Sequence, residues 1–260
     1  MYKTVLNAAN IYDTIFLNVI GVTEYSTIND LIDDDISKYK EWVKFAIDKY
    51  GEKHYSSFDE NDFYIENACK YPEFSKIITI TFCTIHSEDG NLIRKFKKII
   101  DQDEQVLLQK FIDEFAEFHK NSIYASPKFD YTLCGYDIMN SDIPFVIKRL
   151  LLHKQNIEYA NHLIPAIIKT SLNAKPWDDV IIDTKNLWKF NGLKSTPLNL
   201  ISKSLNLKTT VDLMSPVEIN VFYHTPDDEI DIEKKTSILA LQSANIVNLS
   251  IQMLTYLRNV

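Results

Sequence analysis

Apolar side chains recur along the chain with the periods of strands and of helices. Residues 14–22, TIFLNVIGV, are almost continuously apolar, which predicts a buried strand with Asn18 as its polar exception. Residues 76–86, KIITITFCTIH, alternate apolar and polar positions and are rich in β-branched residues, which predicts a second strand. The Asp-Gly pair at 89–90 is a hairpin signal, so 91–99 is predicted to be a third strand, antiparallel to the second.

Helical spacing dominates much of the remaining chain. Helices are predicted over residues 30–50, 104–120, 143–154 and 236–258, and short strands over 131–136 and at the start of 180–190. The early strands form a meander and the later ones alternate with helices. This order predicts an α/β fold in which a mixed sheet, an antiparallel meander plus parallel strands, is flanked by helices. No internal repeat occurs, so we expect a single domain over 1–260.

Charge is distributed unevenly along the chain. The formal net charge is −8, and residues 26–75 hold 12 acidic and 6 basic side chains. We interpret 26–75 as an acidic helical insertion within the domain. An acidic protein repels a phosphate backbone unless basic residues cluster locally or divalent metals intervene. The basic clusters RKFKK at 94–98 and KR at 148–149 are short, so the sequence supports nucleic-acid binding only weakly.

Several classes of site and location are disfavoured by the sequence. Neither GxGxxG nor GxxxxGK[ST] is present, so no nucleotide cofactor is expected. The three cysteines form no CxxC pair and the histidines show no HxH or HxxxH spacing, so no cofactor or structural zinc is expected. The N-terminus lacks the pattern of a signal peptide, and no uninterrupted apolar stretch approaches the ~20 residues that span a bilayer. We therefore expect a cytoplasmic protein without a membrane partner.

Four stretches together resemble one family over nearly the whole chain. They are KIITITF at 76–82, LCGYDIMNSDIPFVIKRLL at 133–151, AKPWDDVIIDTKNLWKFNGLK at 174–194, and the spacing of the last helix. On these residues the chain is similar to the 3′–5′ exonucleases related to the proofreading domain of family B DNA polymerases. This family belongs to the DnaQ-like, DEDDy-type branch of the ribonuclease H-like superfamily. The resemblance implies a ribonuclease H-like fold.

The resemblance also implies a metal-dependent site that this chain lacks in part. Members of the family cut phosphodiesters with two divalent metals held by four carboxylates, with a tyrosine one turn before the last carboxylate. Aligned on the motifs, the two first-strand acids fall on Asn18 and Ile20. The acid that precedes a helix is kept as Asp142, the last-helix acid falls on Asn245, and the tyrosine falls on Leu241. No Asp or Glu occurs from 236 to 260.

One carboxylate does not hold two magnesium ions, so we expect no catalytic residues and no bound metal. Other acids could rebuild a relocated metal site from Asp137, Asp142 and Asp183. Asp183 followed by Thr184 is more simply a helix cap whose carboxylate accepts backbone N–H bonds. Trp177, Trp188 and Lys189 are weak candidates for nucleic-acid contact, since aromatic side chains stack on bases.

The sequence thus predicts a catalytically inactive exonuclease-fold protein that serves as a structural or protein-binding module. Its Asn-, Ile- and Lys-rich composition is typical of an AT-rich genome or its phage. A virion or a replication assembly is therefore an expected setting, with protein partners or self-assembly, and with assembly into a phage particle in the cytoplasm. The alternatives are a nucleic-acid-binding protein without cleavage and an exonuclease with a relocated metal site.

Overall fold

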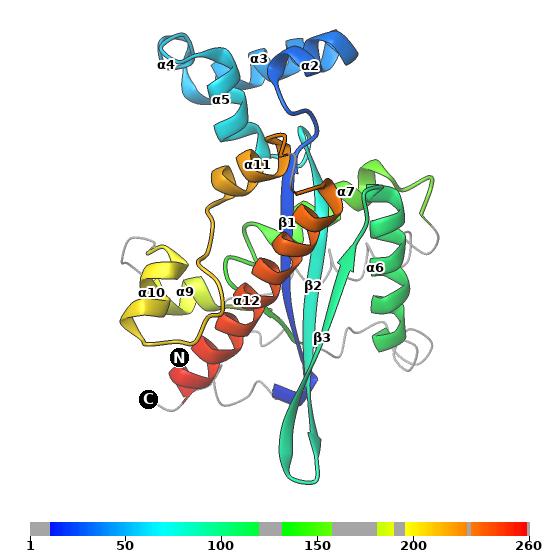
Figure 1. The fold of residues 1–260 in the computed structure, drawn as a ribbon, viewed down its shortest axis with the longest axis vertical. Coiled ribbons are helices and arrows are strands. Elements are labelled where there is room, and N and C mark those ends of the chain that lie inside the picture. Colours follow the sequence, from blue (N-terminus) through cyan, green and yellow to red (C-terminus); the bar gives the residue numbers. More distant parts are fainter. Residues whose placement is uncertain (1–10, 120–131, 158–180, 190–195, 228–229, 259–260) are drawn as a thin grey trace.

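The computed structural model describes residues 11–119, 132–157, 181–189, 196–227 and 230–258. They form an α/β fold with one open five-stranded mixed sheet flanked by helices, as the sequence predicts (Figure 1). The strands are β1 (Thr14–Thr23), β2 (Ser75–Glu88), β3 (Asn91–Ile100), β4 (Thr132–Gly135) and β5 (Ile181–Asp183). Their order in the sheet is β3-β2-β1-β4-β5.

The strand pairing follows the predicted meander. β1 is antiparallel to β2, and β2 is antiparallel to β3, whereas β4 is parallel to both β1 and β5. The β2–β3 turn has Asp89 at φ 52° and Gly90 at φ 78°, the left-handed conformations that a two-residue hairpin requires. The parallel contact between β1 and β4 ends at Phe16 and Cys134, so Asn18 lies where the two strands separate.

Helices cover both faces of the sheet. They are α6 (Glu104–His119), α7 (Asp142–Leu152), α9 (Thr184–Lys189), α10 (Leu198–Ser204), α11 (Pro216–His224) and α12 (Ile232–Arg258). Alternate residues of β1 face opposite ways. Leu17 packs in the cluster with α6 and α7, whereas Phe16 packs in the cluster with α12 and α9. The core therefore has two apolar layers, one on each side of the sheet.

The helix α12 runs along one face of the sheet (Figure 1). Leu239, Leu249 and Met253 are fully buried, whereas Ile246 and Leu257 are half-buried. By length and composition alone, Ile232–Leu257 could cross a membrane, whereas no membrane-spanning segment is predicted from the sequence. Because 61% of its apolar window is buried inside the protein, the core helix of a globular fold accounts for it equally well.

The segment between β1 and β2 is helical. It contains α2 (Ile28–Asp34), α3 (Ile36–Tyr50), α4 (Glu52–Tyr55) and α5 (Glu60–Asn67). The single helix predicted over 30–50 is wrong. Asp35 ends α2 and caps α3, because its side chain accepts the N–H groups of Ser37 and Lys38. An aromatic core built around the fully buried Trp42 holds these helices together.

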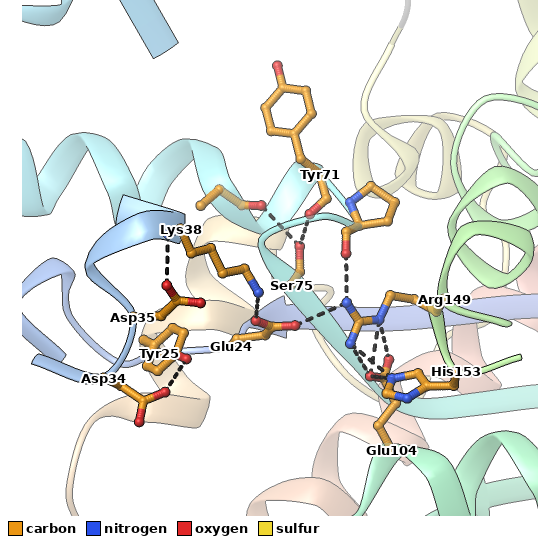
Figure 2. A network of polar contacts seen from close by, with 12 residues as sticks. Glu24, Tyr25, Asp34, Asp35, Lys38, Tyr71, Ser75, Glu104, Arg149 and His153 are labelled. Atoms are coloured by element: carbon orange, nitrogen blue, oxygen red, sulfur yellow. Dashed lines mark hydrogen bonds and ion pairs between the residues drawn. The ribbon is translucent and has the colours of Figure 1, made fainter. Parts of the chain in front are cut away.

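A buried ion-pair network joins this helical segment to the sheet (Figure 2). The Arg149 guanidinium on α7 is 3.0 Å from the Glu24 carboxylate at the end of β1, and it donates to the Pro72 carbonyl at 2.8 Å. It also bonds Glu104 at the start of α6 through two nitrogens. Glu24 in turn pairs with Lys38 of α3. The end of β1, the start of α6, α7 and the helical segment therefore meet at Arg149.

Candidate functional site

The candidate site lies where β1 and β4 separate, beside the first turn of α7. Asn18 on β1 and Asp142 at the start of α7 are both buried, 6% and 3% exposed. The Asn18 Nδ2 donates to Asp142 Oδ2 at 3.4 Å, and Ser243 Oγ of α12 donates to Asn18 Oδ1 at 2.9 Å. Three segments far apart in sequence thus meet through one amide. The side chains of Asn18 and Asp142, predicted from sequence, do come together.

Ser243 was not predicted. Asn245 was expected at this position of the last helix, but its Oδ1 instead accepts the backbone N–H and the hydroxyl of Thr210, at 3.0 and 2.9 Å. Leu241 is 43% exposed and also lies outside the amide contact. A serine within an apolar helix has no distinctive signal, so sequence reasoning had no means of selecting it.

Ile20 continues the face of β1 on which Asn18 lies. It is buried and packs with Ile219 of α11 and Leu239 of α12. A hydrocarbon side chain offers no ligand atom, so the second acidic position of the resemblance is filled by core packing here.

Burial controls the charge of Asp142. Loss of solvent raises the pKa of its carboxyl well above the usual value, and the hydrogen bond from Asn18 offsets this only in part. The carboxylates of Asp137 and Asp183 act in the same direction as burial. Asp142 thus sits in a setting that favours its neutral form.

Asp183 is a structural cap, as predicted. Its Oδ1 accepts the backbone N–H groups of Asp137, Lys185 and Asn186, and its Oδ2 accepts that of Met139. These four bonds tie the start of α9 to the turn that follows β4. Burial raises the pKa of Asp183, while the N–H donors act in the opposite direction.

The Asp137 carboxylate is also bonded to other side chains of the protein. It lies in that turn at φ 61°, a conformation that aspartate tolerates better than most residues. Its carboxylate pairs with Lys185 and accepts a bond from Asn140. Asp137, Asp142 and Asp183 are therefore near one another, but two of them are already bonded to protein groups.

The residues present do not fit the pair of divalent cations that the resemblance implies. Asn18 has an amide in place of a charge, its oxygen is engaged by Ser243, and the Asp183 oxygens accept four N–H bonds. Within the described ranges, no group of three or more histidine, cysteine, aspartate or glutamate side chains could hold a metal ion. Hard cations need several free anionic oxygens, and this arrangement does not offer them.

A groove of about 740 Å³ runs beside Asn18 and Asp142. Of the described residues, three lysines line it, Lys70, Lys148 and Lys185, together with aromatic and amide side chains from the turn after β4. Lys185 pairs with Asp137 and Lys148 with Glu73, so part of this positive charge is balanced.

Two of the weak nucleic-acid candidates, Trp188 and Lys189, lie on α9. Trp188 is half-buried and packs against Leu198, Leu249 and their neighbours, so it is largely a core residue. Lys189 ends the short helix α9 and is half-buried. Trp177 lies outside the described residues.

Comparison with known proteins found no matching family model, no matching curated protein and no matching solved structure. The mixed sheet confirms the predicted fold class, but it does not by itself identify an exonuclease. The family resemblance thus remains a prediction from the sequence.

Proposed function

We propose that this chain is a non-catalytic protein of exonuclease-like fold that acts as a structural or protein-binding module. The observation that carries the proposal is the buried contact in which the Asn18 amide bridges Asp142 and Ser243. The uncharged amide of Asn18, hydrogen-bonded to Asp142 and Ser243, occupies a position at which the resemblance implies a metal-binding carboxylate. A virion or a replication assembly is the setting that we propose for such a module.

Electrostatics explains why hydrolysis would depend on the metal ions. Paired metal ions stabilise the attacking and leaving oxygens in phosphodiester hydrolysis, and each is worth several kcal/mol of the barrier. Without them the rate falls by many powers of ten, since each ~1.4 kcal/mol is a factor of ten. The scaffold itself does not depend on the metals, because apolar packing on both faces of the sheet stabilises it.

Two measurements test the proposal. Purified protein is incubated with end-labelled single-stranded DNA and Mg²⁺ or Mn²⁺, and we expect no digestion above background. Digestion that disappears in the Asp142→Asn variant would contradict the proposal and favour a relocated metal site. Light scattering should in addition find a defined oligomer or a stable complex with a partner. A strictly monomeric protein without a partner would count against the module.

The lysines of the groove favour a second candidate, a nucleic-acid-binding protein without cleavage. Lys70, Lys148 and Lys185 line a concave surface that also contains Tyr136, and aromatic rings stack on bases. Single-strand affinity should then fall steeply with added salt, because bound phosphates release counterions. Affinity that salt does not change, or no affinity at all, would remove this candidate.

A further inference from the structure

β3 is the edge strand of the sheet, and among the described residues no strand pairs with its outer side. The sheet order places β2 on one side of β3, and no other strand of the described part pairs with it. Figure 1 shows the β2–β3 hairpin extending beyond the helices at its turn end. An edge of this kind presents backbone N–H and C=O groups to which another extended chain can bond.

The two faces of β3 differ in how their charges are satisfied. Lys95 and Lys97 point to the same face, and they pair with Glu88 at 3.5 Å and Glu114 at 2.5 Å. Arg94 and Lys98 alternate with them and point to the opposite face. Arg94 donates only to the neutral amide of Asn248, and Lys98 has no ion pair within the described residues. One face therefore keeps two cations without a carboxylate.

The same face is apolar between its cations. Leu92, Phe96 and Ile100 alternate with Arg94 and Lys98, and they are 61%, 39% and 37% exposed. Edge lysines by themselves guard a sheet against association. That explanation does not cover three large apolar side chains left in water beside them.

The positive charges of β3 restrict which kind of partner can bind along its outer edge. A second copy of β3 would bring four Lys or Arg against four others with no acidic residue between 91 and 100, and opposed like charges destabilise a strand pair. The phosphates of a nucleic acid would be repelled by Glu88 and Asp89 in the β2–β3 turn. The exposed leucine and isoleucine have no ring on which its bases could stack. An extended protein segment that alternates acidic and apolar side chains complements both the cations and the hydrophobic residues.

We infer that the outer edge of β3 is a docking site for such an acidic segment of another protein, which adds to the sheet as a further strand. Main-chain bonds supply affinity, and the alternating side chains supply specificity. The inference rests on the proposed function, since it names the partner chemistry of a protein-binding module. We call Leu92, Arg94, Phe96, Lys98 and Ile100 the β3 face.

A synthetic peptide tests the inference directly. The fluorescent peptide Val-Thr-Glu-Thr-Val-Thr-Glu-Thr-Val places acids opposite Arg94 and Lys98 in either strand direction, and its binding is followed by anisotropy. The Arg94→Glu/Lys98→Glu variant should bind it about tenfold more weakly and should instead bind the peptide with lysine in place of glutamate. The Lys95→Glu/Lys97→Glu variant changes net charge equally on the other face and should keep most of the affinity.

Hydrogen exchange supplies the second readout. Backbone amides of β3 should become protected when the peptide binds to the full chain. Equal loss in both double variants, or unprotected β3 amides, would overturn the inference. Binding of an oligothymidylate through the β3 face, without binding of the peptide, would also overturn it and would identify a nucleic-acid surface.

The nuclease assay on the same preparations separates the two proposals. An active protein that binds the peptide would contradict only the proposed function. An inactive protein that ignores the peptide would contradict only the docking site.

Discussion

At Asn18, one amide satisfies two buried neighbours without adding a charge to the site. It donates to Asp142 and accepts from Ser243, and all three side chains are buried. A carboxylate here would accept from Ser243 but would place a second acid against Asp142. An uncharged side chain at position 18 is thus compatible with the burial of this site.

The Asn18→Asp variant should therefore be less stable. We expect its free energy of unfolding to fall by about 1–3 kcal/mol near neutral pH, because two buried acids then adjoin and one donor is lost. Burial raises the pKa of the new carboxyl above its unfolded value, so the loss should shrink as the solution is acidified. Urea denaturation measures it, with the exposed Asn91→Asp as control. Recovery of stability on adding Mn²⁺ would contradict a site unsuited to metal.

His224 makes stability depend on pH. Its Nε2 is 3.0 Å from the Thr23 carbonyl oxygen at the end of β1, so a neutral ring donates there. Burial lowers the pKa of His224 to about 4, and Lys76 acts in the same direction. A ring whose folded pKa lies below the unfolded value of ~6.5 stabilises the fold fully above that value. This stabilisation is lost as the pH falls from about 6.5 toward 4.

Acidification over this interval should cost up to about 3 kcal/mol through His224 alone. Urea unfolding of the protein and of His224→Gln at a series of pH values measures it. Glutamine keeps an N–H donor but does not titrate, so its curve should be flatter in this interval. Two parallel curves would show that another group carries the dependence.

At the scale of elements, local patterns were most successful where a turn or proline signal accompanies the hydrophobic pattern. The β2–β3 hairpin and the α7 helix with Pro144 in its first turn follow the sequence closely. The break at Asp35 was missed because a capping carboxylate inside an acidic run resembles its solvated neighbours. A glycine that lets two strands approach closely, such as Gly135, also leaves no periodic pattern in the sequence.

Gly135 marks a close approach between β4 and β1. A Cβ added there would lie 2.6 Å from the Leu17 carbonyl oxygen and 3.0 Å from Ile138 Cβ. Because the nearest atom is backbone, Gly135→Ala should lower the free energy of unfolding by about 2–3 kcal/mol. Thermal and urea unfolding measure it, with Gly90→Asn in the open hairpin turn as control. Equal stability of Gly135→Ala and the wild type would show that the two strands can separate freely.

At the scale of the molecule, Arg149 joins the helical segment to the sheet. The side chain is 4% exposed and bonds Glu24, Glu104 and the Pro72 carbonyl. Burial lowers the pKa of its guanidinium, but Glu104 and Glu24 outweigh this and raise it. Removing the arginine leaves Glu104 buried among groups that no longer balance its charge.

Arg149→Met should therefore cost about 3–5 kcal/mol, the usual effect of breaking a buried ion pair from one side. The neighbouring Lys148→Met removes an exposed pair with Glu73 and should cost less than about 1 kcal/mol. Both are measured by chemical denaturation, and hydrogen exchange should show α2–α5 opening first in Arg149→Met. Similar small losses in the two variants would contradict the joining role.

The sequence by itself determined the strands, the long helices α6, α7 and α12, and the mixed sheet, because periods of two and 3.6 residues are local properties. Only the tertiary structure decided that Ser243 rather than Asn245 meets Asn18. Residues two apart on a helix point about 200° apart, so the choice depends on how α12 lies across the sheet. The same holds for Arg149 and its partners, which long-range packing brings together.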